Sequence, residues 1–194
     1  MSRFERLGGE VRYAGVIGTV RVDRFRHEDG AVVEREIVAH PGAVGIVAHD
    51  DLHVWLVRQP REAVGVPDLL EIPAGRLDVP GEPPLACAQR ELGEETGRTA
   101  MEWRHLVTFF VSPGFTDETV HLFLATGLGE SDVASDPGER IEIVAWPLDR
   151  LDEAIEQCAD SKSLIGLMWL RDLRAGVVSD APGDDAGGDA PDVA

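Results

Sequence analysis

The feature that most constrains this chain is an acidic segment, residues 75–98, that contains one short helical run. Within it, Arg90 is followed by Glu91, Glu94 and Glu95. Spacings of three and four residues place these carboxylates on one helix face, where like charges repel each other. A cation is expected to hold such a face together, and carboxylate oxygens suit a hard divalent metal. The segment therefore indicates a metal site and, with it, phosphate chemistry.

The ends of this helix are marked by prolines and a glycine. Pro83 and Pro84 suit a first helical turn, because the amide protons that they lack are not needed there. We expect the helix to continue over residues 84–96 and to end at Gly97. Gly93, inside the helix, costs about 1 kcal/mol relative to alanine. A close approach of a ligand or of backbone would explain this glycine, and so would simple tolerance of it.

The charge of the chain limits its partners. The formal net charge is −18, and residues 179–194 contribute five aspartates and no base. The remainder is still acidic, which argues against duplex nucleic acid or an anionic membrane as a partner. An anionic substrate would need a metal or a few placed arginines. Cys87 and Cys158 have no CxxC spacing, and no apolar run approaches a signal core or a membrane span, so we expect a cytoplasmic protein.

Strand and helix patterns alternate irregularly, which favours an α/β fold with a mixed sheet covered by helices on both faces. β-Branched runs over residues 16–39 flank Asp29-Gly30 and predict a hairpin. Pro41-Gly42 then breaks the chain. We expect an N-terminal β subdomain at residues 1–41, a main domain at residues 42–176 and a disordered acidic tail at residues 177–194.

Further elements are expected in the main domain. Strand patterns cover residues 43–49, 53–59, 69–75, 105–111, 118–127 and 141–146. Helical patterns cover residues 149–158 and 161–174.

At the acidic helix the sequence resembles the Nudix hydrolase family, whose signature is a glycine, a glutamate and then Arg-Glu-apolar-any-Glu-Glu-any-Gly-apolar. The matching residues are Gly75, Glu82, Arg90, Glu91, Leu92, Glu94, Glu95 and Gly97. Two positions depart from the signature: six residues rather than five separate Gly75 from Glu82, and Arg98 takes the final apolar place. The resemblance implies the α/β/α sandwich of that family, with the small N-terminal β subdomain added.

The resemblance also implies a ligand set. The implied metal ligands are Glu91, Glu95 and the backbone carbonyl of Ala74, and Glu94 would be a further ligand or hold a metal-bound water. Arg90 and Glu82 would brace the carboxylates, behind the turn at Gly75. The implied ion is Mg²⁺, with Mn²⁺ as the alternative.

Three further segments resemble the ADP-ribose pyrophosphatase branch of this family. LEIPAG at residues 70–75 leads into the signature, Arg-Gln-Pro-Arg at residues 58–61 resembles its Arg-Gln-Tyr-Arg segment, and residues 112–118 form its Ser-Pro-Gly-Phe-like loop. The branch uses an N-terminal β subdomain to build a swapped homodimer. The implied reaction is hydrolysis of ADP-ribose, a nucleoside diphosphate sugar, to AMP and ribose 5-phosphate.

The branch also implies catalytic and substrate-binding residues. Its base is a glutamate from a loop after the last long strand, for which Glu139 is the first choice. Glu142, turned outward by alternation along strand 141–146, is the second. The implied substrate contacts are Arg61 with a phosphate, Glu71 with ribose hydroxyls, and Pro113 and Phe115 from the loop.

Two kinds of alternative stay open. The same chemistry could act on GDP-mannose, a UDP-sugar, a dinucleoside polyphosphate or a flavin nucleotide, although the Pro113 loop weighs against these. A non-catalytic sensor that binds ADP-ribose is a different class of function. Such proteins typically lose signature glutamates or append a DNA-binding domain, and this chain keeps its glutamates.

Overall fold

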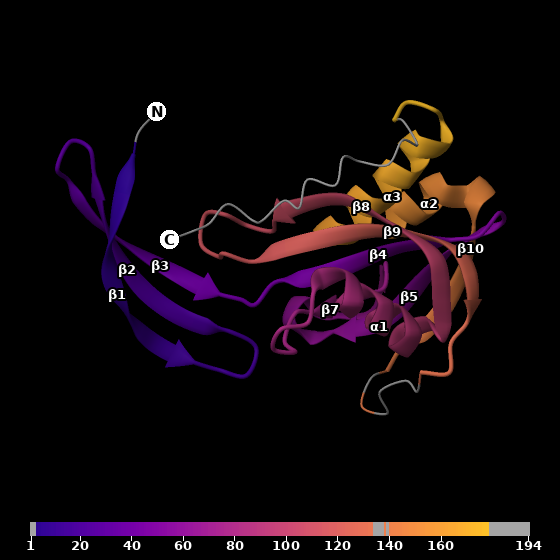
Figure 1. Cartoon of the computed structure of the whole chain (residues 1–194), viewed down its shortest axis with the longest axis horizontal. Helices are drawn as coiled ribbons and strands as arrows, with labels where there is room; N and C mark the ends of the chain where they lie inside the picture. The colour runs from indigo at the N-terminus through magenta and orange to yellow at the C-terminus, as the bar shows by residue number, and fades with distance from the viewer. Residues whose placement is uncertain (1–2, 134–137, 139, 179–194) are drawn as a thin grey trace.

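The computed structural model describes residues 3–133, 138 and 140–178. It contains two sheets, a three-stranded one near the N-terminus and a seven-stranded one that helices cover. In Figure 1 the small sheet lies at one end of the molecule, and β3 leads from it into the large sheet. Within the described ranges, no helix has the length and apolar character needed to cross a bilayer.

The small sheet contains the predicted hairpin and one strand that the sequence did not indicate. β2 (Thr19–His27) and β3 (Val32–Ala39) pair antiparallel across the turn at Gly30, which has a φ of 84°. β1 (Phe4–Ala14) pairs with β2 along its whole length. Its two internal glycines and scattered charges give a weak strand pattern, so pairing with β2 rather than local propensity forms it.

The large sheet is mixed, as expected. Its strands are β4 (Ala43–His49), β5 (His53–Arg61), β6 (Val66–Glu71), β7 (Ala74–Arg76), β8 (Arg98–Phe110), β9 (Thr119–Glu130) and β10 (Glu142–Pro147). The order is β10-β5-β4-β9-β8, with β6 beside β5 and β7 beside β4. β4 and β9 run parallel, whereas the other pairs are antiparallel.

Three α-helices cover the sheet, α1 (Pro84–Thr96), α2 (Leu151–Gln157) and α3 (Ser161–Arg174), and α1 has the predicted bounds. Alternation along β4 divides the core into two layers. Val44, Ile46 and Ala48 pack with α1, whereas Val47 packs with the cluster that includes α2 and α3. Figure 1 shows α1 on one side of the sheet and α2 and α3 on the other. The predicted α/β/α sandwich is therefore confirmed.

A divergence of two strands positions the signature segment. β4 pairs with β5 only through Ala48 and His49, and beyond that point its edge pairs with β7 instead. The chain between β6 and β7 enters this opening, where the Pro73 carbonyl accepts the Ile46 amide at 2.8 Å. The sheet therefore holds Ala74 and Gly75 in place, beside α1.

Candidate active site

Strand β7, at Gly75, lies directly against the acidic helix. A Cβ added to Gly75 would stand 1.9 Å from the carboxyl carbon of Glu91, so only glycine permits this approach. One helical turn further on, Glu95 Oε2 accepts the Ala74 amide at 2.9 Å. Two signature carboxylates of α1, Glu91 and Glu95, therefore contact the backbone of β7, although β7 precedes the helix in the chain.

Arg90 holds three signature carboxylates together, Glu82, Glu91 and Glu94. Its Nη1 donates to Glu91 Oε1 at 2.7 Å and to Glu94 Oε2 at 2.8 Å. Its Nε and Nη2 donate to the two oxygens of Glu82 at 3.1 and 3.0 Å. These hydrogen bonds hold the pKa of Glu82 below its ordinary value and raise the pKa of Arg90. One guanidinium therefore serves three carboxylates.

The donors gathered here are oxygens, which fits a hard divalent cation. The carboxylates of Glu91 and Glu95 and the Ala74 backbone lie on the same side of α1, and Gly75 leaves room for a carboxylate between helix and strand. Among the residues that the structure describes, no three His, Cys, Asp or Glu side chains stand in the arrangement of a formed metal site. Arg90 engages Glu91 and Glu94 instead. Binding a cation would require those two side chains to exchange partners.

Cys87, although it lies among these residues, has no nucleophilic role. The thiol is buried, and its Sγ donates to the Arg76 carbonyl at 3.4 Å. Burial, reinforced by the charge of Glu91, raises its pKa to about 12. Because the thiolate is the nucleophilic form, this cysteine is a packing residue.

The unexpected glycine in α1 has a packing explanation. A Cβ on Gly93 would meet Ser131 Oγ at 3.0 Å and Val133 Cβ at 3.1 Å, and the Ser131 amide donates to the Gly97 carbonyl. The chain leaving β9 therefore passes against α1, on its way to the segment with the predicted base.

The structure describes only one of the two candidate bases. Glu139 lies outside the described residues. Glu142 is exposed, and by alternation it shares the face of Val144 and Trp146, which pack in the layer of α2 and α3. It pairs in register with Arg58, whose Nη2 donates to Gln157 of α2. That face is opposite to the one covered by α1.

Arg61 and Glu71, both predicted as substrate contacts, bind each other. Arg61 Nε donates to Glu71 Oε2 at 2.7 Å, and Lys162 Nζ donates to Glu71 Oε1 at 2.7 Å. Because both oxygens already accept from cations, these contacts give no support to a direct bond from Glu71 to ribose. Sequence reasoning missed Lys162, although it is the only lysine of the chain.

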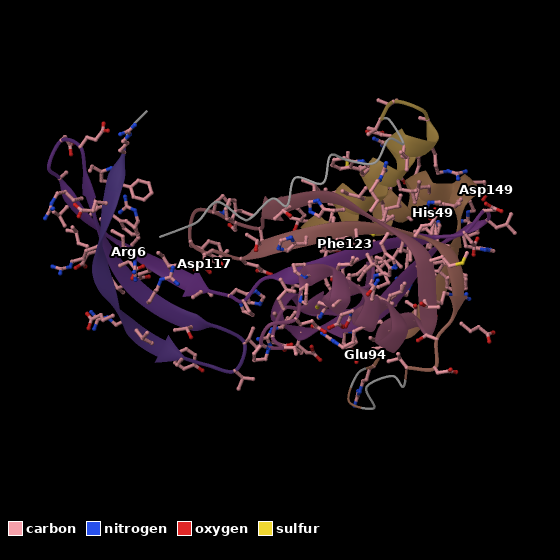
Figure 2. All side chains as sticks on the ribbon, in the orientation of Figure 1. Arg6, His49, Glu94, Asp117, Phe123 and Asp149 are labelled. Carbon is pink, nitrogen blue, oxygen red and sulfur yellow. The ribbon has the colours of Figure 1, made fainter. Side chains whose placement is uncertain are left out.

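The loop with Pro113 and Phe115 does not join the acidic helix. Hydrogen bonds join it to β3 and the residue after it: Phe115 O accepts the Val38 amide at 2.8 Å, and Asp117 Oδ1 accepts the His40 amide at 2.9 Å. Figure 2 shows Asp117 well apart from Glu94 of α1. Phe115 is 56% exposed, so this aromatic ring is not part of the core.

Arg98, the departure from the signature, packs much as an apolar residue would. Its guanidinium carbon lies 3.3 Å from the centroid of the Trp55 ring. That ring is fixed in turn, because its Nε1 donates to Asp50 Oδ2 at 3.0 Å. A cation over an aromatic face supplies both contact area and electrostatic attraction. This departure from the signature therefore leaves the acidic face of α1 undisturbed.

Replacing Arg90 with methionine should destabilise the protein in a pH-dependent way. The low pKa of Glu82 means that its bonds with Arg90 stabilise the fold above about pH 4.3, the unfolded pKa of a glutamate. This contribution is lost as the pH falls through the lower folded pKa. We expect R90M to lower the free energy of unfolding by about 2 kcal/mol at pH 7 and by less at pH 3.

Urea unfolding with EDTA present measures this difference without a contribution from metal. R150M is the matched control, because the ion pair of Arg150 with Glu153 is exposed on the surface and should matter little at either pH. An equal loss for R90M at both pH values would contradict the role given to Arg90.

Comparisons with known proteins agree with this site. The family model described as NUDIX domain matches residues 39–165. The ADP-ribose pyrophosphatase of Mycobacterium tuberculosis is 48% identical over 128 residues, which are 66% of this chain and 61% of that protein. The ADP-ribose pyrophosphatase of Bacillus subtilis is 35% identical over 170 residues, covering 85% of this chain and 91% of that protein.

A solved structure supports the fold. The crystal structure of an ADP compounds hydrolase aligns with a TM-score of 0.79 at 24% identity, covering 90% of this chain and 96% of that one. The family model spans more than half of the chain and includes the whole α1 region. The chain belongs to the Nudix family, whose hydrolases generally use divalent metal ions.

Proposed function

We propose that this protein hydrolyses the diphosphate of ADP-ribose to AMP and ribose 5-phosphate. The observation that carries the chemistry is the close approach of Glu91 to Gly75, where a carboxylate of the signature helix lies against strand β7. The substrate is supported by the relatives from M. tuberculosis and B. subtilis, both named ADP-ribose pyrophosphatase. The chain spans 61% of the length of the first relative and 91% of the second.

We propose that a divalent cation, Mg²⁺ or else Mn²⁺, binds at the acidic face. Its ligands would be Glu91, Glu94, Glu95 and the carbonyl of Ala74. It would supply charge neutralisation for the diphosphate and a lowered pKa for the attacking water. Arg90 would keep Glu82 paired while Glu91 and Glu94 turn from the guanidinium to the cation. The Ala74 amide would hold Glu95 in orientation, as it does here.

A base is needed to take a proton from the attacking water as it adds to phosphorus and the anhydride P–O bond breaks. We propose Glu139 for this role, with Glu142 as the second choice. The passage of residues 131–133 against α1 supports a base in the segment that follows. The face on which Glu142 lies supports it less.

Substrate contacts are proposed at two places. Arg61 would bind a phosphate, since its side chain is 39% exposed and its described hydrogen bond uses only Nε. Arginine suits this role because its remaining donors match phosphate oxygens in pairs. Pro113 and Phe115 would contact the substrate from the loop that lies beside β3. The two buried free thiols are compatible with action in the cytoplasm.

A panel of nucleoside diphosphate derivatives tests this function. With Mg²⁺, we expect ADP-ribose to be cleaved faster than GDP-mannose, a UDP-sugar or a flavin nucleotide, and EDTA to stop the reaction. E95Q should lower kcat by roughly a hundredfold or more with the fold retained. E102Q is the matched control: Glu102 is an exposed glutamate of β8, and the variant should keep wild-type activity.

Several results of this panel would count against the proposal. Binding of ADP-ribose without turnover would identify a sensor, and faster cleavage of another substrate would change the assignment. Full activity of E95Q would contradict the metal site.

The two candidate bases can be separated by amide substitution. E139Q should lower kcat by about 10²- to 10⁴-fold, the usual contribution of general acid–base catalysis. E142Q should change kcat much less, because that side chain lies in the layer of α2 and α3. Initial rates across the pH range measure both variants, and the reverse ranking would assign the base to Glu142.

We also propose that residues 1–41 form the dimer interface of a homodimer. β1 is an outer strand of its sheet and carries solvent-exposed apolar side chains, including Val11 at 62% and Tyr13 at 64% exposure. Val16 and Ile17, in the turn after β1, are also exposed. An apolar patch of this kind on a small sheet commonly marks a protein interface.

Tyr13→Asp should shift the protein from dimer to monomer, because it places a charge within this apolar surface. Light scattering coupled to size exclusion measures the mass. M101D is the matched control, since Met101 is 83% exposed but belongs to β8 of the other sheet. A monomeric wild type, or an undisturbed dimer in Y13D, would argue against the interface.

A further inference from the structure

We propose that Lys162 is a positioning residue. By neutralising part of the charge of the buried Glu71 carboxylate, it leaves the positive charge of Arg61 available to the substrate diphosphate. This inference rests on the proposed function, because that function makes Arg61 the phosphate contact.

Glu71 is the centre of the arrangement. It ends β6, is only 2% exposed and has a different cation on each of its oxygens. Three residues later the chain reaches Ala74, whose amide binds Glu95. An extended chain covers about 10 Å in three residues. Glu71, which binds Arg61, therefore lies close along the chain to the backbone that contacts the acidic helix.

Lys162 is itself fixed at the start of α3. Its Nζ donates to Asp160 Oδ2 at 2.9 Å, and the same oxygen accepts the Ser163 amide as the helix cap. Ser163 Oγ, in turn, accepts the Ile72 amide at 2.9 Å. Two contacts thus tie the first turn of α3 to the end of β6. Lys162 is 15% exposed at its side chain, so its charge is directed at Glu71 rather than at solvent.

The charges of this cluster balance. Arg61 and Lys162 carry two positive charges, and Glu71 and Asp160 carry two negative ones. Removing the lysine charge would leave a net negative cluster beside the phosphate contact, in a chain that already carries a charge of −18. Arg61 would then have to compensate the buried carboxylate alone, because an unpaired buried charge is costly. Less of its positive charge would face the substrate.

Kinetics with ADP-ribose and metal test this role. We expect K162M to raise KM roughly tenfold while kcat changes less than about twofold, since a binding contact rather than the chemical step is weakened. K162R should retain most of the affinity because it restores the charge. The double variant E71Q/K162M should recover affinity over K162M, since removing both charges rebalances the cluster.

Two further measurements separate positioning from a merely structural role. R171M is the matched control: Arg171 also lies on α3 but pairs with Asp172, so its KM should equal that of the wild type. Calorimetric binding of ADP-ribose with EDTA present should follow the same order as KM. A thermal unfolding scan shows whether each variant is folded.

The outcomes are distinct. An unchanged KM and binding constant in K162M, or no recovery in the double variant, would overturn the role of Lys162 while leaving the proposed function intact. A wild type that neither binds nor cleaves ADP-ribose would overturn the proposed function and this inference together.

Discussion

The arrangement of the site depends on one guanidinium among carboxylates. Arg90 contacts Glu82, which precedes α1, and Glu91 and Glu94 of α1, and these carboxylates would otherwise repel each other. The side chain is partly shielded from solvent, so these contacts are screened less than surface ion pairs. The same arginine leaves Glu95 to the backbone of β7. Arg90 therefore braces Glu82, Glu91 and Glu94, whereas Glu95 is bonded to the strand.

The sheet explains why β7 is available to meet the helix. If β4 and β5 paired along their full length, no edge of β4 would remain for Ala74 and Gly75. Their separation after Ala48 and His49 opens that edge, and the Pro73 carbonyl secures the inserted chain. The glycine at position 75 then matters for its absent side chain, since a Cβ would occupy the place of the Glu91 carboxylate. The strand pairing of β4 with β7 therefore positions the backbone that the carboxylates of α1 contact.

Local signals predicted much of the fold and part of the site. The prolines before α1 and Gly97 after it determine the helix ends through backbone chemistry within a few residues, and both predictions are confirmed. β1 escaped prediction because its sequence is a poor strand former without β2. The pairing of Lys162 with Glu71 joins positions 91 residues apart, and no periodicity or spacing indicates such a contact. Sequence patterns identify reactive side chains, whereas tertiary contacts decide their partners.

The net negative charge of the molecule makes the partners of its cationic side chains important. An acidic protein that binds a diphosphate must present positive charge locally, and long cationic side chains are mobile unless something holds them. Here buried or half-buried carboxylates do so, with Glu71 fixing Arg61 as the glutamates of α1 fix Arg90. A carboxylate in this setting acts as an anchor for a cation rather than as a repulsive group. The many acids of the sequence and the binding of an anion are compatible for that reason.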